Sequence, residues 1–204
     1  NPLSPVRVLT VGIMSRLALL CLSATLVATS PGVAQVAIDP IGKITPNGRF
    51  DGGSKVQLGR DAAGRPVCFV REEGDSHRLD IGIGAGGAFV RLETPEPRDA
   101  TPVPPVRVYA GLQQTENGRA TDRFMVLRPY EGEVAYFVPT SGQGSFTLLA
   151  ASAPDAFLAV VAAAGGNFLV IEQRRSAVRD YVAIYDFNEQ AAAAVAACRQ
   201  RHAL

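Results

Sequence analysis

This chain of 204 residues has no tryptophan, two methionines, two histidines and three cysteines. Transition-metal sites favour clusters of histidine and cysteine, and a nucleophilic catalytic site needs a base beside its nucleophile. The chain has few residues from which either kind of site could be built. Basic and acidic residues nearly balance, at 20 against 19. A nucleic-acid-binding surface needs a clear excess of positive charge. The composition therefore predicts no metal site, no cofactor and no nucleic-acid partner.

The chain also lacks an apolar run near its N-terminus that is long enough to cross a membrane, which takes about 20 residues. The apolar stretch Leu17–Ala28 has 12 residues. It follows Met14 and an arginine, and it ends in a Ser-Pro-Gly turn before Ala34. A charged start, an apolar middle and a small-residue exit are typical of a secretory signal peptide. We therefore predict cleavage of residues 14–34, and we interpret residues 1–13 as an upstream extension or the start of a fragment.

Export predicts where the protein works and how it is organised. Cleavage removes Arg7 and Arg16, which leaves 18 basic against 19 acidic residues. Of the 20 basic residues, 18 are arginine, which together with abundant alanine favours a bacterial source with a GC-rich genome. We expect a periplasmic or secreted bacterial protein with no permanent membrane anchor. Residues 35–65, rich in Gly, Pro, Asn and Asp, are expected to form a loosely ordered leader before a single domain at 66–204.

Two cysteines, Cys68 and Cys198, remain after cleavage, in a compartment that permits disulfides. A bond between them would tie the first strand of the domain to its last helix. The alternative is two buried thiols that pack as small hydrophobic groups. A catalytic or metal-binding role lacks the neighbouring cysteine and histidine that it requires. We predict the disulfide.

Alternating apolar residues predict a strand-rich front, and alanine-rich segments predict two helices near the end. Asn117-Gly118 is a reversal signal, and a hairpin is expected around residues 129–132. Ser152 is expected to cap the first helix, and the second is expected to begin at Asn188 or Glu189. The predicted fold class is α+β: a single domain with a largely antiparallel sheet of about six to eight strands and two Ala-rich helices in the C-terminal third. The expected strands are 66–71, 79–83, 89–93, 106–112, 124–127, 133–138, 146–150, 168–173 and 181–187.

Gly82, Gly84 and Gly87 have the G-x-G-x-x-G spacing of dinucleotide-binding loops. That chemistry requires a helix directly after the glycines, whereas residues 88–94 have the composition of a strand. Glycines of a tight or bulged hairpin explain the same spacing, and we favour this interpretation.

Four residues of possible catalytic type lie close together in the sequence: Asp75, Ser76, His77 and Asp80. Neighbouring side chains on a turn or strand point apart, so adjacency alone does not make a triad. We interpret the segment as a solvated turn. The acidic residues within 72–75 are too few and too poorly spaced for a calcium loop, and we interpret them as a charged turn.

Three features together resemble one known family: the signal peptide, the Cys-bearing strand 66–71, and the strand running through Phe187 into the alanine-rich segment that ends at Cys198. In these features the chain resembles the invasion-associated locus B group of secreted bacterial proteins. The resemblance implies a non-enzymatic envelope or secreted protein, and it implies no catalytic residues.

The leading hypothesis is a non-enzymatic binding module that contacts an envelope protein or a small ligand. Its expected contact surface is the loop 94–105, which carries five prolines in twelve positions. Loops held on a rigid sheet often carry function. One alternative is a periplasmic hydrolase assembled from distant carboxylates or His77, and another is a secreted enzyme inhibitor that inserts the loop 141–145 into its target.

Overall fold

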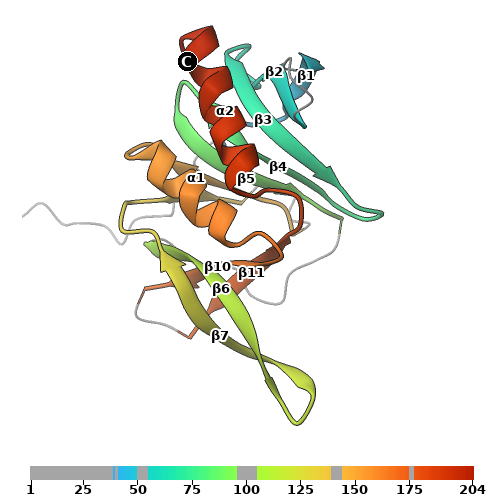
Figure 1. Cartoon of the computed structure of the whole chain (residues 1–204), viewed down its shortest axis with the longest axis vertical. Helices are drawn as coiled ribbons and strands as arrows, with labels where there is room; N and C mark the ends of the chain where they lie inside the picture. Colours follow the sequence, from blue (N-terminus) through green and yellow to red (C-terminus); the bar gives the residue numbers. More distant parts are fainter. Residues whose placement is uncertain (1–38, 40, 50–54, 96–104, 139–143, 175–176) are drawn as a thin grey trace, which may run out of the picture. The chain divides into compact units, whose positions relative to one another are not determined.

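The structure, a computed structural model, describes residues 39, 41–49, 55–95, 105–138, 144–174 and 177–204 (Figure 1). The predicted signal peptide and the upstream residues 1–13 lie outside this part of the chain. The described residues belong to one compact unit, Val36–Leu204.

The larger of two sheets contains seven strands, and every neighbouring pair is antiparallel. Its spatial order is β1-β2-β3-β4-β5-β9-β8, which we call sheet A. The first five strands follow one another in the chain and pair in that order, and β9 then pairs with β5. The strands are β1 (Thr45–Arg49), β2 (Val56–Arg60), β3 (Pro66–Glu73), β4 (Arg78–Gly84), β5 (Gly87–Glu93), β8 (Ala135–Phe137) and β9 (Phe146–Ala150).

The smaller sheet, sheet B, has four antiparallel strands in the order β11-β10-β6-β7. These are β6 (Val106–Glu116), β7 (Arg119–Pro129), β10 (Asn167–Gln173) and β11 (Arg179–Ile184). The predicted α+β class and its largely antiparallel strands are confirmed. The described residues form eleven strands in two sheets, which corrects the expected single sheet of about six to eight strands.

The expected hairpin between residues 124–127 and 133–138 is wrong. Strand β7 instead pairs with β6, and β8 pairs with β9 in the other sheet. The reversal at Asn117 and Gly118 explains this partner choice. Their φ angles of 52° and 73° are both positive, as a two-residue type I′ turn requires, and such a turn joins β6 directly to β7.

Helices α1 (Pro154–Ala163) and α2 (Glu189–His202) pack against each other, α1 beside β5 and β6 and α2 beside β3 and β4 (Figure 1). Asn188 caps α2 by accepting a hydrogen bond from the Ala191 backbone N–H at 3.0 Å, so the predicted start is confirmed. The predicted Ser152 cap is wrong. The N-cap of α1 is Ala153, whose backbone is left-handed at φ 46° and whose side chain has no group that could accept a cap bond.

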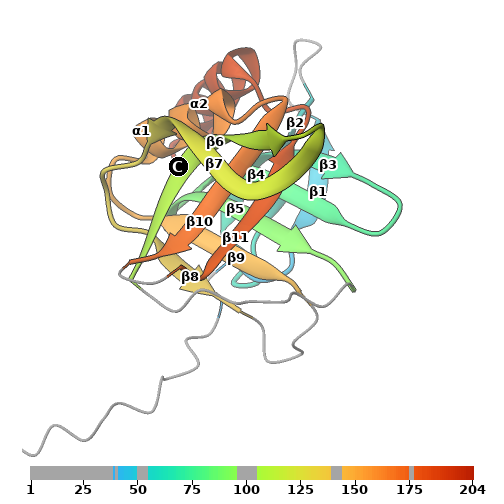
Figure 2. The ribbon, with the colours of Figure 1, turned by 90° about the horizontal axis from the view of Figure 1, so that it is seen from below.

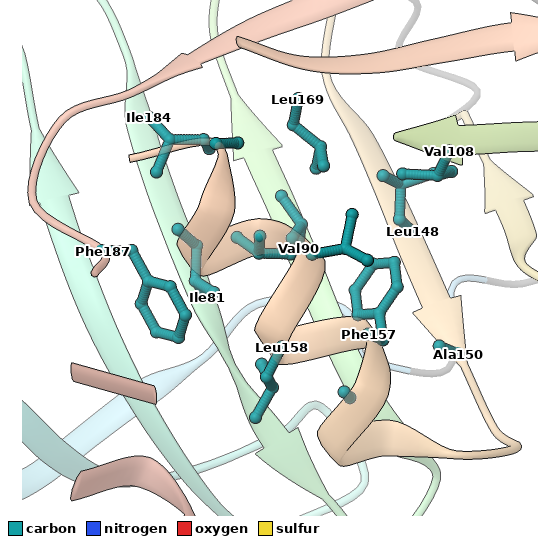
Figure 3. Close-up of a cluster of buried hydrophobic side chains, with 14 of the residues drawn as sticks. Ile81, Val90, Val108, Leu148, Ala150, Phe157, Leu158, Leu169, Ile184 and Phe187 are labelled. Atoms are coloured by element: carbon teal, nitrogen blue, oxygen red, sulfur yellow. The ribbon is translucent and has the colours of Figure 1, made fainter. Parts of the chain in front are cut away.

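The main core lies between the two helices and the inner faces of both sheets (Figure 3). Each sheet contributes alternate residues of its strands, as the period of two demands. Phe157 of α1 and Phe187, just before α2, are fully buried in it. Side chains labelled in Figure 3 come from every layer: Ile81, Val90, Leu148 and Ala150 from sheet A, Val108, Leu169 and Ile184 from sheet B, and Leu158 from α1.

A second, smaller apolar cluster lies on the opposite face of sheet A. There Ile41 and Ile44, which precede β1, pack with Val67, Phe69 and Phe89. The expected loosely ordered leader is therefore wrong for residues 41–49 and 55–60, which contain β1, β2 and buried isoleucines. The apolar residues of this segment are too scattered in the sequence to show periodicity. Ile41 and Ile44 are nevertheless buried, because side chains on the outer face of β3 and β5 pack against them.

The glycine motif forms part of the β4–β5 hairpin, as the favoured interpretation predicted. Gly84 and Gly87 pair directly at its end, and a strand rather than a helix follows them. Gly82 lies further along β4, paired with Phe69 on one side and Phe89 on the other.

Candidate functional site

The two predicted disulfide residues are joined. Cys68 of β3 and Cys198 of α2 form a disulfide with a Cα–Cα distance of 6.0 Å. Both cysteines are fully buried. Cys198 lies on the side of α2 that faces sheet A, where it meets Cys68. The predicted disulfide is confirmed, and its place in the core gives it a structural role.

Glu72 is not part of a charged turn, as the sequence had indicated, but a buried residue of β3. Its carboxylate accepts hydrogen bonds from three successive backbone N–H groups, those of Tyr185 at 3.1 Å, Asp186 at 2.8 Å and Phe187 at 3.0 Å. These groups lie between β11 and α2. Glu72 therefore fixes the approach of the chain to α2, and its oxygens are committed to backbone rather than to a cation.

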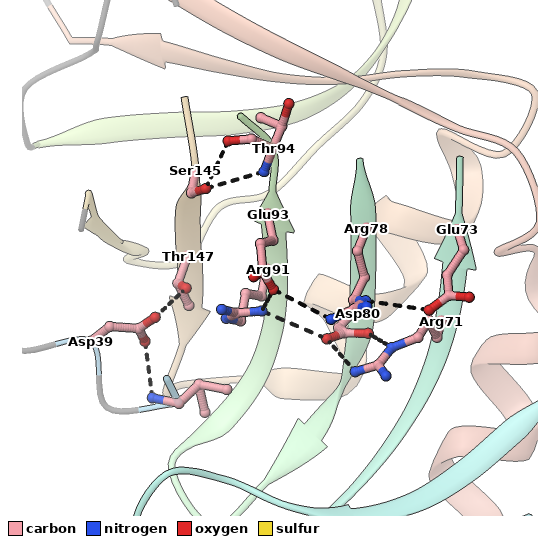
Figure 4. A network of polar contacts seen from close by, with 11 residues as sticks. Asp39, Arg71, Glu73, Arg78, Asp80, Arg91, Glu93, Thr94, Ser145 and Thr147 are labelled. Atoms are coloured by element: carbon pink, nitrogen blue, oxygen red, sulfur yellow. Dashed lines mark hydrogen bonds and ion pairs between the residues drawn. The ribbon is translucent and has the colours of Figure 1, made fainter. Parts of the chain in front are cut away.

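Asp80 likewise does not lie in the solvated turn that the sequence predicts. It is fully buried on β4, where Arg71 of β3 donates to its two oxygens at 2.6 and 3.0 Å (Figure 4). Arg91 of β5 lies 3.9 Å away on the other side. The hydrogen bond to Asp80 raises the pKa of Arg71 above its ordinary value. The three residues stand opposite one another on adjacent strands, so this row is an ion-pair network within the sheet.

His77 lines a shallow hollow of about 360 Å³ with Ser76, next to the paired side chains of β3, β4 and β5. Arg78 lies between Glu73 at 3.3 Å and Glu93 at 3.6 Å (Figure 4). Asp80 does not line this hollow, since its carboxylate is held by Arg71. The structure therefore does not assemble the sequence neighbours 75–80 into a catalytic triad.

A larger groove, of about 760 Å³, opens where β6 begins and where β7 and β10 end. Charged side chains from β6, from β10 and from the segments that follow β7 and β10 surround it, and most of the remaining wall is apolar or aromatic. The charged residues are Arg107, Glu131, Glu172 and Arg174, and the others include Val108, Tyr109, Val126, Pro129 and Tyr130.

The centre of the charged side is Glu172, which is buried between two arginines. Arg107 donates to one carboxylate oxygen at 2.6 Å, and Arg179 donates to the other at 3.1 Å. The three residues are cross-strand neighbours on β6, β10 and β11. The guanidinium of Arg107 also lies over the ring of Tyr109, 5.6 Å from its centroid. Burial, followed by the charge of Glu172, raises the pKa of the Tyr109 hydroxyl above 10.0.

Arg174 and Glu131 differ from this paired set. Both are exposed, and neither side chain has a hydrogen bond or ion pair with another described residue. The backbone N–H of Arg174 donates to the carbonyl of Pro105 at 3.0 Å. The groove therefore lies beside the C-terminal end of the predicted contact loop 94–105, whose residues 96–104 lie outside the described part of the chain.

Sequence reasoning did not find this groove. The alternation of residues 106–112 did place Arg107 and Tyr109 together on one face of a strand. Its partner Glu172, however, is 65 positions away, and only the pairing of β6 with β10 brings the two together. The proposed inhibitor loop 141–145 is described only at Gly144 and Ser145, of which Ser145 bonds to the Thr94 backbone at 3.1 Å.

Within the described ranges, no cluster of three or more His, Cys, Asp or Glu residues has the arrangement of a metal site. None of the described helices combines the length and apolar character needed to span a membrane. Comparison with known proteins found no matching family model, no matching curated protein and no matching solved structure.

Proposed function

We propose that this protein is an exported binding module of the bacterial periplasm or medium, which takes an envelope protein or a small ligand into the groove beside Glu172. The observation that carries the proposal is the groove itself. It combines exposed apolar contact at Val126 and Pro129 with two charged side chains, Arg174 and Glu131, that have no partner within the described structure. Ligand sites commonly join an apolar wall to a few polar groups that fix orientation.

The rest of the groove is pre-organised for binding. Glu172 holds Arg107 in place through a short charge-assisted hydrogen bond, and Arg107 in turn covers Tyr109. A rigid wall loses little conformational entropy when a ligand binds. The free charges of opposite sign suit a ligand that itself carries both signs, as a peptide segment or a zwitterionic small molecule does.

The hydrolase alternative gains no supporting observation from this groove. General acid–base catalysis needs a carboxylate or histidine that is free to exchange a proton with the substrate. Glu172 is occupied by two arginines, and the described lining contains no histidine. Glu131 remains as a lone free carboxylate, which supports recognition rather than a two-residue mechanism. The inhibitor and the invasion-associated locus B resemblance stay predictions.

Photo-crosslinking in the bacterial envelope tests the proposal. A benzophenone amino acid replaces Glu131 or Arg174 in the full chain, and Ala193, exposed on α2, carries it in the control. We expect the same adduct from both groove positions and none from position 193. Adducts that are absent, or equal at all three positions, would overturn the groove as the binding site. Mass spectrometry of the recovered protein tests export separately, with an expected N-terminus at Gln35.

A further inference from the structure

Strand β7 is the last strand of sheet B, and it pairs only with β6 among the described strands. The hairpin formed by β6 and β7 projects beyond the other described elements (Figure 1), and Figure 2 shows it from its tip. An edge strand presents unpaired backbone groups, which natural proteins usually shield with charged side chains or proline. The middle of β7 has no such protection.

Exposed apolar side chains are concentrated on this edge. Met125, Val126 and Leu127 follow one another on β7 with 47%, 48% and 43% of their surface exposed. Leu112, the β6 partner of Met125, is 43% exposed. These four make up most of the six exposed large hydrophobic side chains in the described structure. Met125 shares one face with its partner Leu112, and Val126 points to the other, so apolar side chains are exposed on both faces of this edge. A group of this kind, unlike single exposed residues, marks an interaction surface.

We infer that the occupant of this surface is a second copy of the chain, with the two β7 strands antiparallel and a twofold axis at Met125. This register places Met125 opposite itself and Phe124 opposite Val126 of the second copy. It also places Asp122 opposite Arg128, and the symmetry makes that ion pair twice. An interface formed by the same patch on both copies closes after two subunits.

Charge selects this register from the alternatives. Asp122 is the one acidic residue of β7, and its side chain has no hydrogen bond or ion pair with another described residue. Pairing Asp122 with Arg123 instead would set Met125 opposite Ala120 and Val126 opposite Arg119, which leaves the apolar run against a short or charged side chain. The register about Met125 pairs Asp122 with Arg128 and keeps Phe124, Met125 and Val126 opposite apolar residues, and it sets only Arg123 opposite an apolar residue, Leu127. Opposite charges at facing positions, as for Asp122 and Arg128, stabilise a strand pair, whereas like charges at facing positions destabilise it.

The pairing is short, so the dimer is weak. The register of β7 against β6 shifts between Ala110 and Gly111 and again between Gln113 and Thr115, so the longest regular run of β7 is the three residues 124–126. An interface of this length belongs with small, transient ones that bury less than about 1,200 Å². The near balance of charge in the whole chain opposes association very little. We expect a dimer that dissociates at micromolar concentrations.

Sedimentation velocity on the protein purified from the periplasm, over a range of concentrations, tests the inference. We expect a reversible dimer for the unmodified chain, and a dissociation constant raised by about tenfold or more in Met125→Lys, which would place two like charges on the axis. Tyr185→Lys, at an exposed aromatic residue outside sheet B, is the matched control and leaves the dimer unchanged. A chain that stays monomeric at every concentration, or a dimer indifferent to Met125→Lys, overturns the inference.

Two further variants test the register. Asp122→Arg weakens the dimer, and Asp122→Arg with Arg128→Asp restores it, because the exchange rebuilds both ion pairs. Met125→Cys forms a disulfide-linked dimer under mild oxidation, whereas Glu116→Cys, near the hairpin tip, does not. Failure of the double exchange to restore the dimer would exclude this register. Val126 belongs both to this edge and to the groove wall, so the groove crosslinks at positions 131 and 174 are repeated in Met125→Lys. Adducts that persist in this variant come from a groove ligand, and adducts that disappear with the dimer come from the second copy.

Discussion

Glu72 accepts a hydrogen bond at 3.0 Å from the backbone N–H of Phe187, 115 positions later in the chain. The same carboxylate also bonds the two preceding N–H groups, so one side chain of β3 anchors the whole turn before α2. Phe187 is fully buried in the main core next to that turn. The bond therefore couples β3, an interior strand of sheet A, to the placement of the last helix.

We expect Glu72→Ala to lower the free energy of unfolding by about 2–4 kcal/mol. The substitution leaves three buried or partly buried backbone N–H groups without their charged acceptor. Urea denaturation followed by circular dichroism measures the loss. Glu73→Ala, its exposed neighbour, is the control and should change stability by less than about 0.5 kcal/mol. Equal effects of the two substitutions would contradict the role given to Glu72.

Loss of the disulfide should have a larger effect. The bond between Cys68 and Cys198 closes a loop of 130 residues, and the chain-entropy argument gives about 4–5 kcal/mol for a loop of that length. The double variant Cys68→Ala, Cys198→Ala should show this loss in urea. Peptide mapping of the native protein without reductant should yield the two cysteine peptides linked. Recovery of two free thiols would refute the disulfide.

Gly82 should not tolerate even an alanine. A Cβ there would lie 2.2 Å from the carbonyl oxygen of Cys68 and 2.6 Å from the Cβ of Phe69, so the backbone of β3 would have to move. We expect Gly82→Ala to cost about 3 kcal/mol or more, in the range of severe overpacking. Gly86→Ala, in the turn of the same hairpin, meets nothing closer than 3.8 Å and should be nearly neutral. Thermal unfolding of both variants compares them directly.

The titration of Glu93 should report the ion pairs of sheet A. A hydrogen bond from Arg91 at 3.0 Å lowers the pKa of Glu93 below its ordinary value of 4.5. A carboxylate with a lowered pKa in the folded state stabilises the fold above pH 4.5, and this contribution is lost as the pH falls through the lowered value. NMR titration of the Glu93 side chain should show the low pKa, and Arg91→Gln should raise it.

Arg60→Gln provides the control for this titration. Arg60 lies on β2 and donates to the carbonyl of Gly64, so its removal leaves the partners of Glu93 in place. A Glu93 pKa that Arg91→Gln leaves unchanged would show that the ion pair does not form in solution.

Local chemistry made part of the fold predictable. The helix-capping residue Asn188 and the positive-φ turn at Asn117-Gly118 act within a few positions of the chain, so their sequence signals were sufficient. Strand alternation likewise identified most strands, because the period of two is a local property. The start of α1 was less predictable, since the helix begins one residue later than a Ser152 cap would require.

The candidate site was less accessible to sequence reasoning. Asp80 and Glu72 were interpreted as surface charges because the segment 71–80 is rich in charged and polar residues of both signs, which is typical of an exposed turn. Their burial depends on partners presented by neighbouring strands and by the turn before α2. The groove depends in the same way on the contact of Glu172 with Arg107 across sheet B.

The sequence by itself determined the strand-rich front, the two helices, the cysteine pairing and the hairpin turn, since each follows from composition or from contacts within a few residues. Only the tertiary structure decided the division into two sheets, the burial of Glu72, Asp80 and Glu172, and the exposed edge of β7. Strand partners are chosen by the summed free energy of contacts between segments far apart in the chain. That sum has no local signature, which is why strand identity was predictable and strand pairing was not.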